Sequence, residues 1–156
     1  MQVTHRSPNH SARPVGVVPS LVVLHATAGR DDSSDVFWCC QPESKVSYHV
    51  IVGRSGKVYV LVPFDRRAWH AGVSEWKGRH NVNNFSLGFA FANRHDGIER
   101  LTTEQIAVMK ALIEGVRERY PNIEVVTHGM IAPGRKDDPS RIPNFSLADY
   151  TGALIG

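Results

Sequence analysis

A short segment rich in proline and glycine, residues 128–139, holds side chains that could perform metal-dependent hydrolysis. His128 offers an imidazole, and Asp138 offers a carboxylate two residues after Lys136. Imidazole and carboxylate groups are good ligands for a divalent metal, and the lysine ammonium could face a reacting carbonyl group. A second histidine, His25, ends a different apolar run. Two histidines and one acid at strand ends predict a catalytic zinc site, whose fourth position stays open for water.

The strands that must carry these groups are visible in the hydrophobic pattern. Five are predicted, at residues 21–26, 45–52, 57–62, 85–92 and 124–127. The first is a continuous apolar run, which suits a strand buried on both faces. The segment 53–56 contains two glycines, so we expect the second and third strands to form a hairpin.

Three helices are expected around these strands. The clearest covers residues 103–119, where Thr102 or Thr103 followed by Glu-Gln provides the N-terminal cap. Its buried stripe is formed by Ile106, Met109, Leu112, Ile113 and Val116. A shorter helix, capped by Ser33 or Ser34, should end before Pro42, and a third is expected after Ser146.

The sum is a single α/β domain, with a mixed central sheet of about five strands flanked by helices. Residues 1–20 are expected to form an irregular N-terminal arm, and residues 21–156 the catalytic domain. Residues 65–84 are interpreted as a long polar loop, and loops of this length in compact domains are usually functional.

Composition excludes several classes of protein. The formal charge of the 156-residue chain is +3, but no run of five basic residues occurs, which argues against nucleic-acid binding. No apolar stretch is long enough for a membrane span or a secretory signal, so we expect synthesis in the cytoplasm. The two cysteines, Cys39 and Cys40, are adjacent and are expected to be free thiols, because their spacing excludes a structural zinc site.

Six segments carry a further signal through their order along the chain. They are LVVLHATAG (21–29), VSYHVIVGRSGKVYVLVP (46–63), RAWHAGVSEWKG (67–78), NNFSLGFAF (83–91), TTEQIAVMKALI (102–113) and VVTHGMIAPGRKDDP (125–139). In this order they resemble the zinc-dependent N-acetylmuramoyl-L-alanine amidases of the type 2 family. That family includes phage lysozyme-type amidases, cytoplasmic muropeptide-recycling amidases and peptidoglycan recognition proteins.

The resemblance assigns roles to eight side chains. It implies that one zinc ion per chain is held by His25, His128 and Asp138. It implies that two side chains are catalytic, namely Tyr48 and Lys136. It implies that three line the substrate groove, namely Trp69, His70 and Asn84, and His70 could either contact substrate or support a zinc ligand from behind. Asp137 is the neighbouring alternative to Asp138, and His49 is expected to be structural because it should point away from Tyr48 on a strand.

The sequence departs from the family pattern at position 90. Several members carry a glutamate there that serves as general base, whereas this chain has Ala90. The lysozyme-type members also lack this acid, which favours them and puts weight on Tyr48 and Lys136. The ammonium of Lys136 could stabilise the negative oxygen that forms when the amide carbonyl is attacked, and Tyr48 could orient the water.

The main expectation is therefore a phage or prophage endolysin, which hydrolyses the amide bond between N-acetylmuramic acid and L-alanine in the bacterial cell wall. Such an enzyme would act as a monomer, accumulate in the host cytoplasm and need a membrane-permeabilising partner, a holin, to reach peptidoglycan. One alternative is a cytoplasmic recycling amidase that acts on soluble muropeptides. A second is a peptidoglycan-binding module without catalysis, although such members typically lose a zinc ligand.

Overall fold

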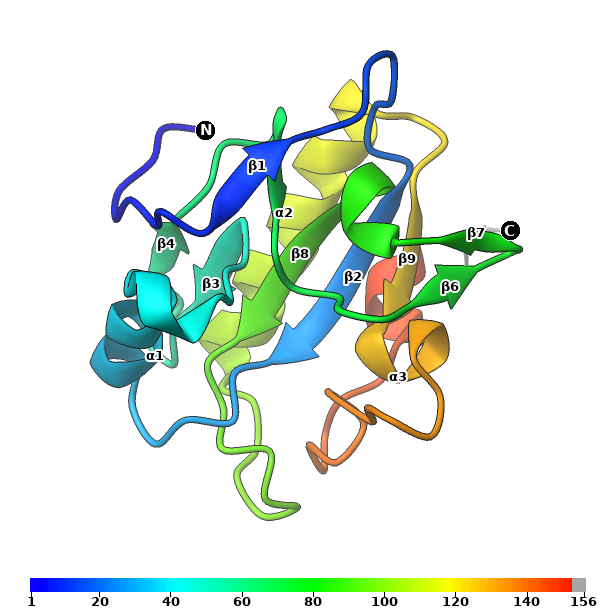
Figure 1. The fold of residues 1–156 in the computed structure, drawn as a ribbon. Helices are drawn as coiled ribbons and strands as arrows, with labels where there is room; N and C mark the ends of the chain where they lie inside the picture. Colours follow the sequence, from blue (N-terminus) through cyan, green and yellow to red (C-terminus); the bar gives the residue numbers. More distant parts are fainter. Residues whose placement is uncertain (153–156) are drawn as a thin grey trace.

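The computed structural model describes residues 1–152 and is built on a five-stranded sheet (Figure 1). The strand order is β4-β3-β8-β2-β9. In chain order these strands are β2 (Leu21–Ala26), β3 (Val50–Val52), β4 (Val58–Val60), β8 (Ser86–Phe91) and β9 (Glu124–Thr127). The α/β class and the expected number of strands are both confirmed.

The sheet is mixed in direction. β2 lies parallel to both β8 and β9, and β3 is also parallel to β8. Only β4 runs antiparallel, and it is joined to β3 by the predicted hairpin turn, in which Gly56 has a positive φ of 89°. The carboxyl ends of β2, β8 and β9 therefore meet at one edge of the sheet, where ligands of open α/β sheets commonly bind.

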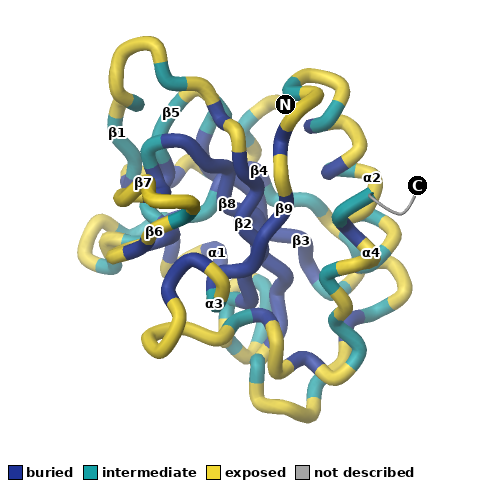
Figure 2. The backbone as a smooth tube through the Cα atoms, turned by 90° about the vertical axis from the view of Figure 1, so that its right-hand side faces the viewer, coloured by how far each residue is buried: buried dark blue, intermediate teal, exposed yellow. Residues whose placement is uncertain are grey.

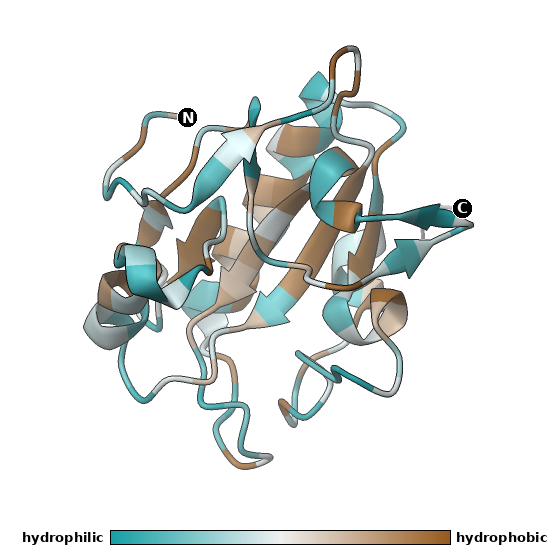
Figure 3. Cartoon of the chain, viewed as in Figure 1, coloured by the Kyte–Doolittle hydropathy of each residue, from teal (hydrophilic) through white to brown (hydrophobic). Residues whose placement is uncertain are grey.

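Helix α2 (Thr103–Arg119) covers one face of this sheet, and helix α1 (Asp32–Cys39) with the long connections covers the other (Figure 1). All six residues of β2 are buried, as the continuous apolar run predicted. Figures 2 and 3 show the sheet as the buried and largely hydrophobic layer between these covers. The α2 side is filled by a large apolar cluster that includes Leu24, Phe89, Phe91, Met109 and Ile113.

The helix boundaries follow local capping chemistry. Thr102 caps α2 through a capping box with Gln105, so the predicted bounds of 103–119 are confirmed. The cap expected at Ser33 or Ser34 was wrong, because Asp31 caps α1 and its side chain accepts the Ser34 N–H. The short C-terminal helix exists as α4 (Ala148–Thr151).

Two predicted regions differ in detail. The strand expected at 45–52 is short, because residues 42–44 form a 3₁₀ turn (η1, Pro42–Ser44) and Lys45 has a left-handed backbone. The predicted loop 65–84 contains the strands β5 (Arg66–Ala68), β6 (Glu75–Trp76) and β7 (Arg79–His80), followed by the 3₁₀ turn η2 (Val82–Phe85). Neither the 3₁₀ turn at residues 42–44 nor the short strands within residues 65–84 have a periodic hydrophobic pattern. Contacts with distant residues therefore determine their structure.

The N-terminal arm is ordered along the domain and is less irregular than expected. Strand β1 (His10–Ala12) pairs with β5 in antiparallel fashion. The backbone N–H groups of Thr4 and His5 donate to the Val60 carbonyl, and that of Ser7 donates to the Leu61 carbonyl. Residues 4–7 therefore lie along β4, the edge strand of the central sheet.

Two expectations from composition concern cysteines and membrane spans. Cys39 and Cys40 are both free thiols, with Cys39 buried and Cys40 half-buried. Among the described residues, no helix has both the length and the apolar character that crossing a membrane requires.

Candidate metal centre

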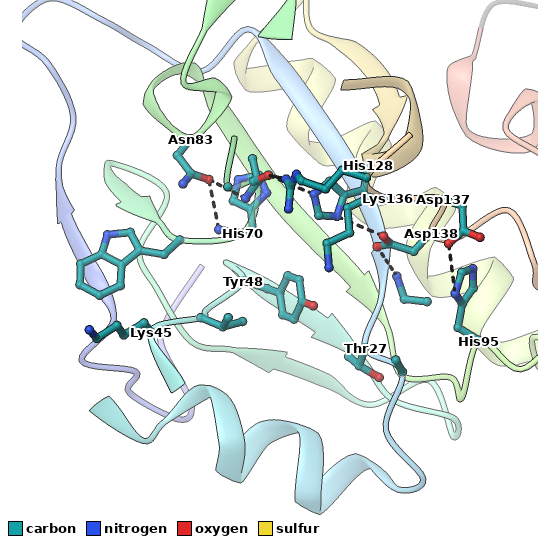
Figure 4. Close-up of a pocket in the computed structure, with 17 residues that line it drawn as sticks. Thr27, Lys45, Tyr48, His70, Asn83, His95, His128, Lys136, Asp137 and Asp138 are labelled. Atoms are coloured by element: carbon teal, nitrogen blue, oxygen red, sulfur yellow. Dashed lines mark hydrogen bonds and ion pairs between the residues drawn. The ribbon is translucent and has the colours of Figure 1, made fainter. Parts of the chain in front are cut away.

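His25, His128 and Asp138 converge at the carboxyl edge of the sheet, and Figure 4 shows His128 and Asp138 of this cluster facing each other. Their ligand atoms all lie within 4.8 Å of one another. Nδ1 of His25 is 3.3 Å from one carboxylate oxygen of Asp138, and Nδ1 of His128 is 3.1 Å from the other. Two imidazole nitrogens and one carboxylate oxygen form the donor set of many catalytic zinc sites, so the cluster fits that metal.

The topology explains why residues so distant in sequence meet. His25 lies near the end of β2, and His128 follows directly after β9, its parallel neighbour. Thr127 ends β9 and caps a one-turn helix, α3 (His128–Ile131), by accepting the Met130 N–H. His128 thus begins a helical turn, whereas a loop was expected, and the turn fixes the direction of its side chain.

The loop that returns to the cluster is held by the backbone. The Ala26 N–H donates to the Asp138 carboxylate at 3.3 Å, and the Gly129 N–H donates to the Asp138 carbonyl. Asp137 is exposed and accepts a hydrogen bond of 2.6 Å from Nε of Arg141. Asp138 is therefore the aspartate of the cluster, and Asp137 faces away from it.

Burial and hydrogen bonding shift the pKa values of the cluster in opposite directions. Burial opposes ionisation of Asp138, but hydrogen bonds from His128 and His25 outweigh it and hold the Asp138 pKa well below its usual range. Burial lowers the pKa of His25 to about 4, although the hydrogen bond to Asp138 acts against this. An ionised carboxylate beside a neutral imidazole is the protonation state that metal binding requires.

The histidines are also held on their far sides. Nε2 of His25 lies 2.9 Å from Nδ1 of His70, and Nε2 of His70 lies 3.0 Å from the Ser86 hydroxyl. Nε2 of His128 donates to the Ala71 carbonyl at 3.0 Å. His70 is 7% exposed, and burial lowers its pKa well below the usual value, so the ring is neutral.

The cluster opens into a cavity of about 600 Å³, which is lined by most of the residues that the sequence singled out. They include Tyr48, Trp69, His70, Lys136 and Asp138. None of residues 1–20 lines this cavity.

Tyr48 and Lys136 approach the cluster from different elements. The Tyr48 ring centroid is 5.0 Å from that of His25, and Figure 4 shows the ring facing the cavity. Burial raises the pKa of Tyr48 well above its ordinary value, so the hydroxyl keeps its proton near neutral pH. Lys136 is exposed and lies on the loop between α3 and Asp138, on the other wall.

The expected substrate-groove residues are only partly found at the cavity. Trp69 lines it, and its indole N–H donates to the Ser11 hydroxyl at 3.1 Å. Asn84 is absent from the cavity wall, because its side-chain oxygen accepts a hydrogen bond from Arg67. Its neighbour Asn83 lines the cavity instead, and the 3₁₀ turn η2 decides which of the two asparagines faces inward.

Three of the basic side chains that line the cavity were not singled out from the sequence, namely Lys45, His95 and Arg135. Arg135 directly precedes Lys136 in the segment 125–139, and this was the only feature of the sequence that could have pointed to it. Lys45 and His95 both have positive φ angles in connecting segments, and such positions carry no periodic pattern.

Position 90, where several family members carry a glutamate, lies on β8 beside the candidate metal cluster. Ala90 is fully buried and pairs with His25 in the register between β2 and β8. Side chains at paired positions point to the same face of a sheet, so a longer side chain there would lie beside His25. The expectation that His49 is structural fits its contacts, since its ring accepts the Gly88 N–H and contacts the Arg66 carbonyl.

Comparisons with known proteins agree with this geometry. The family model described as N-acetylmuramoyl-L-alanine amidase matches residues 14–141. The 1,6-anhydro-N-acetylmuramyl-L-alanine amidase AmpD of Citrobacter freundii is 33% identical over 165 aligned positions, which cover 92% of this chain and 85% of that protein. A crystal structure of an AmpD derivative superposes with a TM-score of 0.80 at 30% identity, covering 96% of this chain and 97% of the other.

A phage enzyme shares the fold at lower similarity. The Ph2119 endolysin of a Thermus scotoductus bacteriophage has a TM-score of 0.56 at 22% identity, covering 85% of this chain and 86% of the endolysin. At this level of identity the likeness concerns the fold alone.

Proposed function

The chain belongs to the N-acetylmuramoyl-L-alanine amidase family, and from this premise we propose that it hydrolyses the amide between 1,6-anhydro-N-acetylmuramic acid and L-alanine in soluble muropeptides. The observation that carries the proposal is the cluster of His25, His128 and Asp138, of which His128 and Asp138 line a cavity large enough for a muropeptide end. Cavities of a few hundred Å³ or more are typical of sites for small ligands.

One zinc ion per chain would be held by these three side chains. Zinc bound there would polarise the amide carbonyl and make water a stronger nucleophile near neutral pH. The chain prepares the ligands for this role, because the Asp138 carboxylate is ionised and both histidines direct Nδ1 toward it. The Ala26 N–H bonds to Asp138 and limits its rotation.

Lys136 and Tyr48 are proposed to handle the charge and protons of the reaction. The Lys136 ammonium, on the exposed wall of the cavity, would stabilise the negative oxygen that develops on the attacked carbonyl and would supply a proton to the leaving amine. Tyr48 keeps its proton, so its hydroxyl would act as a hydrogen-bond donor that orients the reacting groups rather than as a base. Trp69 would form a side wall for the substrate.

The choice of soluble muropeptides revises the endolysin expectation. That expectation rested on the missing acid at position 90, which the lysozyme-type members also lack. The similarity to AmpD covers nearly the whole chain at 33% identity, whereas the similarity to the phage endolysin supports only the fold. The higher identity to AmpD favours the recycling amidase over the endolysin. The cytoplasmic location expected from the sequence stays a prediction.

The test compares two substrates with one protein. The purified chain is stripped of metal with a chelator, reloaded with zinc and given either soluble 1,6-anhydro-muropeptides or intact sacculi. We expect mass spectrometry to detect free stem peptides that begin with alanine, formed from the soluble substrate only after zinc is restored.

Two results would contradict the proposal. Release from sacculi that is as fast as release from the soluble substrate would restore the endolysin interpretation. A zinc-loaded protein that cleaves neither substrate, but binds wall fragments, would favour the binding module.

A further inference from the structure

Two consecutive residues, His70 and Ala71, contact the far sides of both histidines of the metal cluster. The His70 ring meets Nε2 of His25 at 2.9 Å, and the Ala71 carbonyl accepts a hydrogen bond from Nε2 of His128 at 3.0 Å. His70 and Ala71 are both buried. Figure 4 shows His70 beside His128 on the wall of the cavity.

This dipeptide is itself fixed from two directions. The side-chain oxygen of Asn83 accepts the N–H groups of both His70 and Ala71, at 3.1 and 2.8 Å. The His70 ring lies flat against the backbone of Gly88, where an added Cβ would come within 2.4 Å of the ring. Glycine is therefore required at position 88 if the ring is to occupy this place.

We propose that His70 and Ala71 act as a positioning clamp that holds His25 and His128 with Nδ1 directed at the metal. Partners of this kind fix the ring orientation and the tautomer of a histidine ligand. The inference rests on the proposed metal role of the two histidines. Of the two roles that the sequence left open for His70, it favours support of a zinc ligand over substrate contact, since both ring nitrogens are already engaged.

When metal is bound, the hydrogen bonds behind the cluster should all run in one direction, from His25 through His70 to Ser86. If Nδ1 of His25 ligates the metal, the proton of that ring resides on Nε2, which then donates to Nδ1 of His70. The His70 proton must in turn reside on Nε2 and be donated to the Ser86 hydroxyl. Zinc binding thus selects one tautomer in each ring along a buried chain of three side chains.

The test measures zinc affinity directly, by competition with a chromophoric chelator and without substrate. His70→Leu removes the acceptor for His25, whereas His70→Asn keeps an oxygen near the position of Nδ1. We expect His70→Leu to lower zinc affinity by about 10- to 100-fold and His70→Asn to lose much less. The matched control His80→Asn, at an exposed histidine on β7, should bind zinc as the wild type does.

A second measurement needs no substitution and applies even if His70→Leu does not fold. Nitrogen-15 NMR of the zinc-loaded wild type should show the His70 proton on Nε2. The clamp is refuted if zinc-loaded His70 carries its proton on Nδ1, or if folded His70→Leu binds zinc within about threefold of the wild type. Absence of zinc binding by the wild type would instead refute the proposed metal site.

Discussion

Along β2, neighbouring side chains point to opposite faces of the sheet, and the two faces carry different chemistry. Leu24 faces α2 and packs in the large apolar cluster, whereas His25 faces the metal cluster. On β8 the same alternation separates Phe89 from Gly88, which leaves room for the His70 ring. Because side chains alternate along a strand, the six residues of β2 contribute to the apolar core on one face and to the site on the other. If the two faces are independent, a substitution on one of them should leave the other unchanged.

The largest expected effect is on the metal face. His25→Ala removes one of the three proposed ligands, so zinc affinity should fall on the order of 10³-fold, and amidase activity should be lost with it. The melting temperature of the metal-free protein should change little, because the α2 face is untouched. Chelator competition and thermal unfolding of the metal-free protein measure the two quantities, with His80→Ala as control. A large loss of metal-free stability would show that the faces are coupled.

The next substitution addresses the opposite face at a neighbouring position. Phe89→Ala deletes a fully buried ring beside α2 and should lower the free energy of unfolding by about 3–5 kcal/mol. Zinc affinity of the folded fraction should be retained. Urea unfolding measures the first quantity, and Phe37→Ala, on the exposed side of α1, is the matched control. If Phe89→Ala folds fully yet no longer binds zinc, the two faces of the sheet are not independent.

A third substitution separates charge stabilisation from metal binding within the site face. Lys136→Ala should reduce the turnover rate of soluble muropeptides by about 10²–10³-fold, because it removes the donor that we propose stabilises the developing negative oxygen. Zinc affinity and stability should stay near wild-type values, since Lys136 is exposed. Steady-state kinetics measure this effect. The control is Lys110→Ala, which lies on the exposed surface of α2. Full activity in Lys136→Ala would remove the proposed oxyanion role.

The smallest predicted effect concerns a buried acid on the site face. Asp35, on α1, accepts a hydrogen bond of 2.6 Å from the Thr27 hydroxyl, and burial raises its pKa to about 6. The folded state therefore binds this proton more tightly than the unfolded state, whose pKa is about 4, and stability falls as pH rises from about 4 to 6.

Asp35→Asn should remove that loss and gain about 1 kcal/mol of stability at pH 8 relative to pH 4. Unfolding at both pH values measures it, and the exposed Asp65→Asn is the control. An equal change at the two pH values would mean that the charge of Asp35 does not limit stability.

Local patterns predicted the elements whose hydrogen bonds and burial are themselves local. The bounds of β2, β9 and α2 follow from continuous apolar runs and from the Thr102–Gln105 capping box. The meeting of His25 with His128 follows from placing both at the ends of parallel strands. These features need little knowledge of the rest of the chain.

Contacts between distant residues decided what the sequence could not predict. The choice between Asn83 and Asn84 depends on the 3₁₀ turn η2, and the role of His70 depends on the distance to His25 across 45 positions of sequence. The small strands β5, β6 and β7 exist because they pair with β1 or with each other, and none has a periodic pattern.

The N-terminal residues that lie along β4 have a practical consequence for anyone who shortens this protein. A chain trimmed to the family-matched residues 14–141 would lose both β1 and the segment 4–7, whose N–H groups occupy carbonyls on and beside the outer strand. That strand would then present unpaired carbonyls to solvent, and exposed edges of this kind recruit other chains. Self-association in concentrated samples would follow, even with every residue of the catalytic cavity intact.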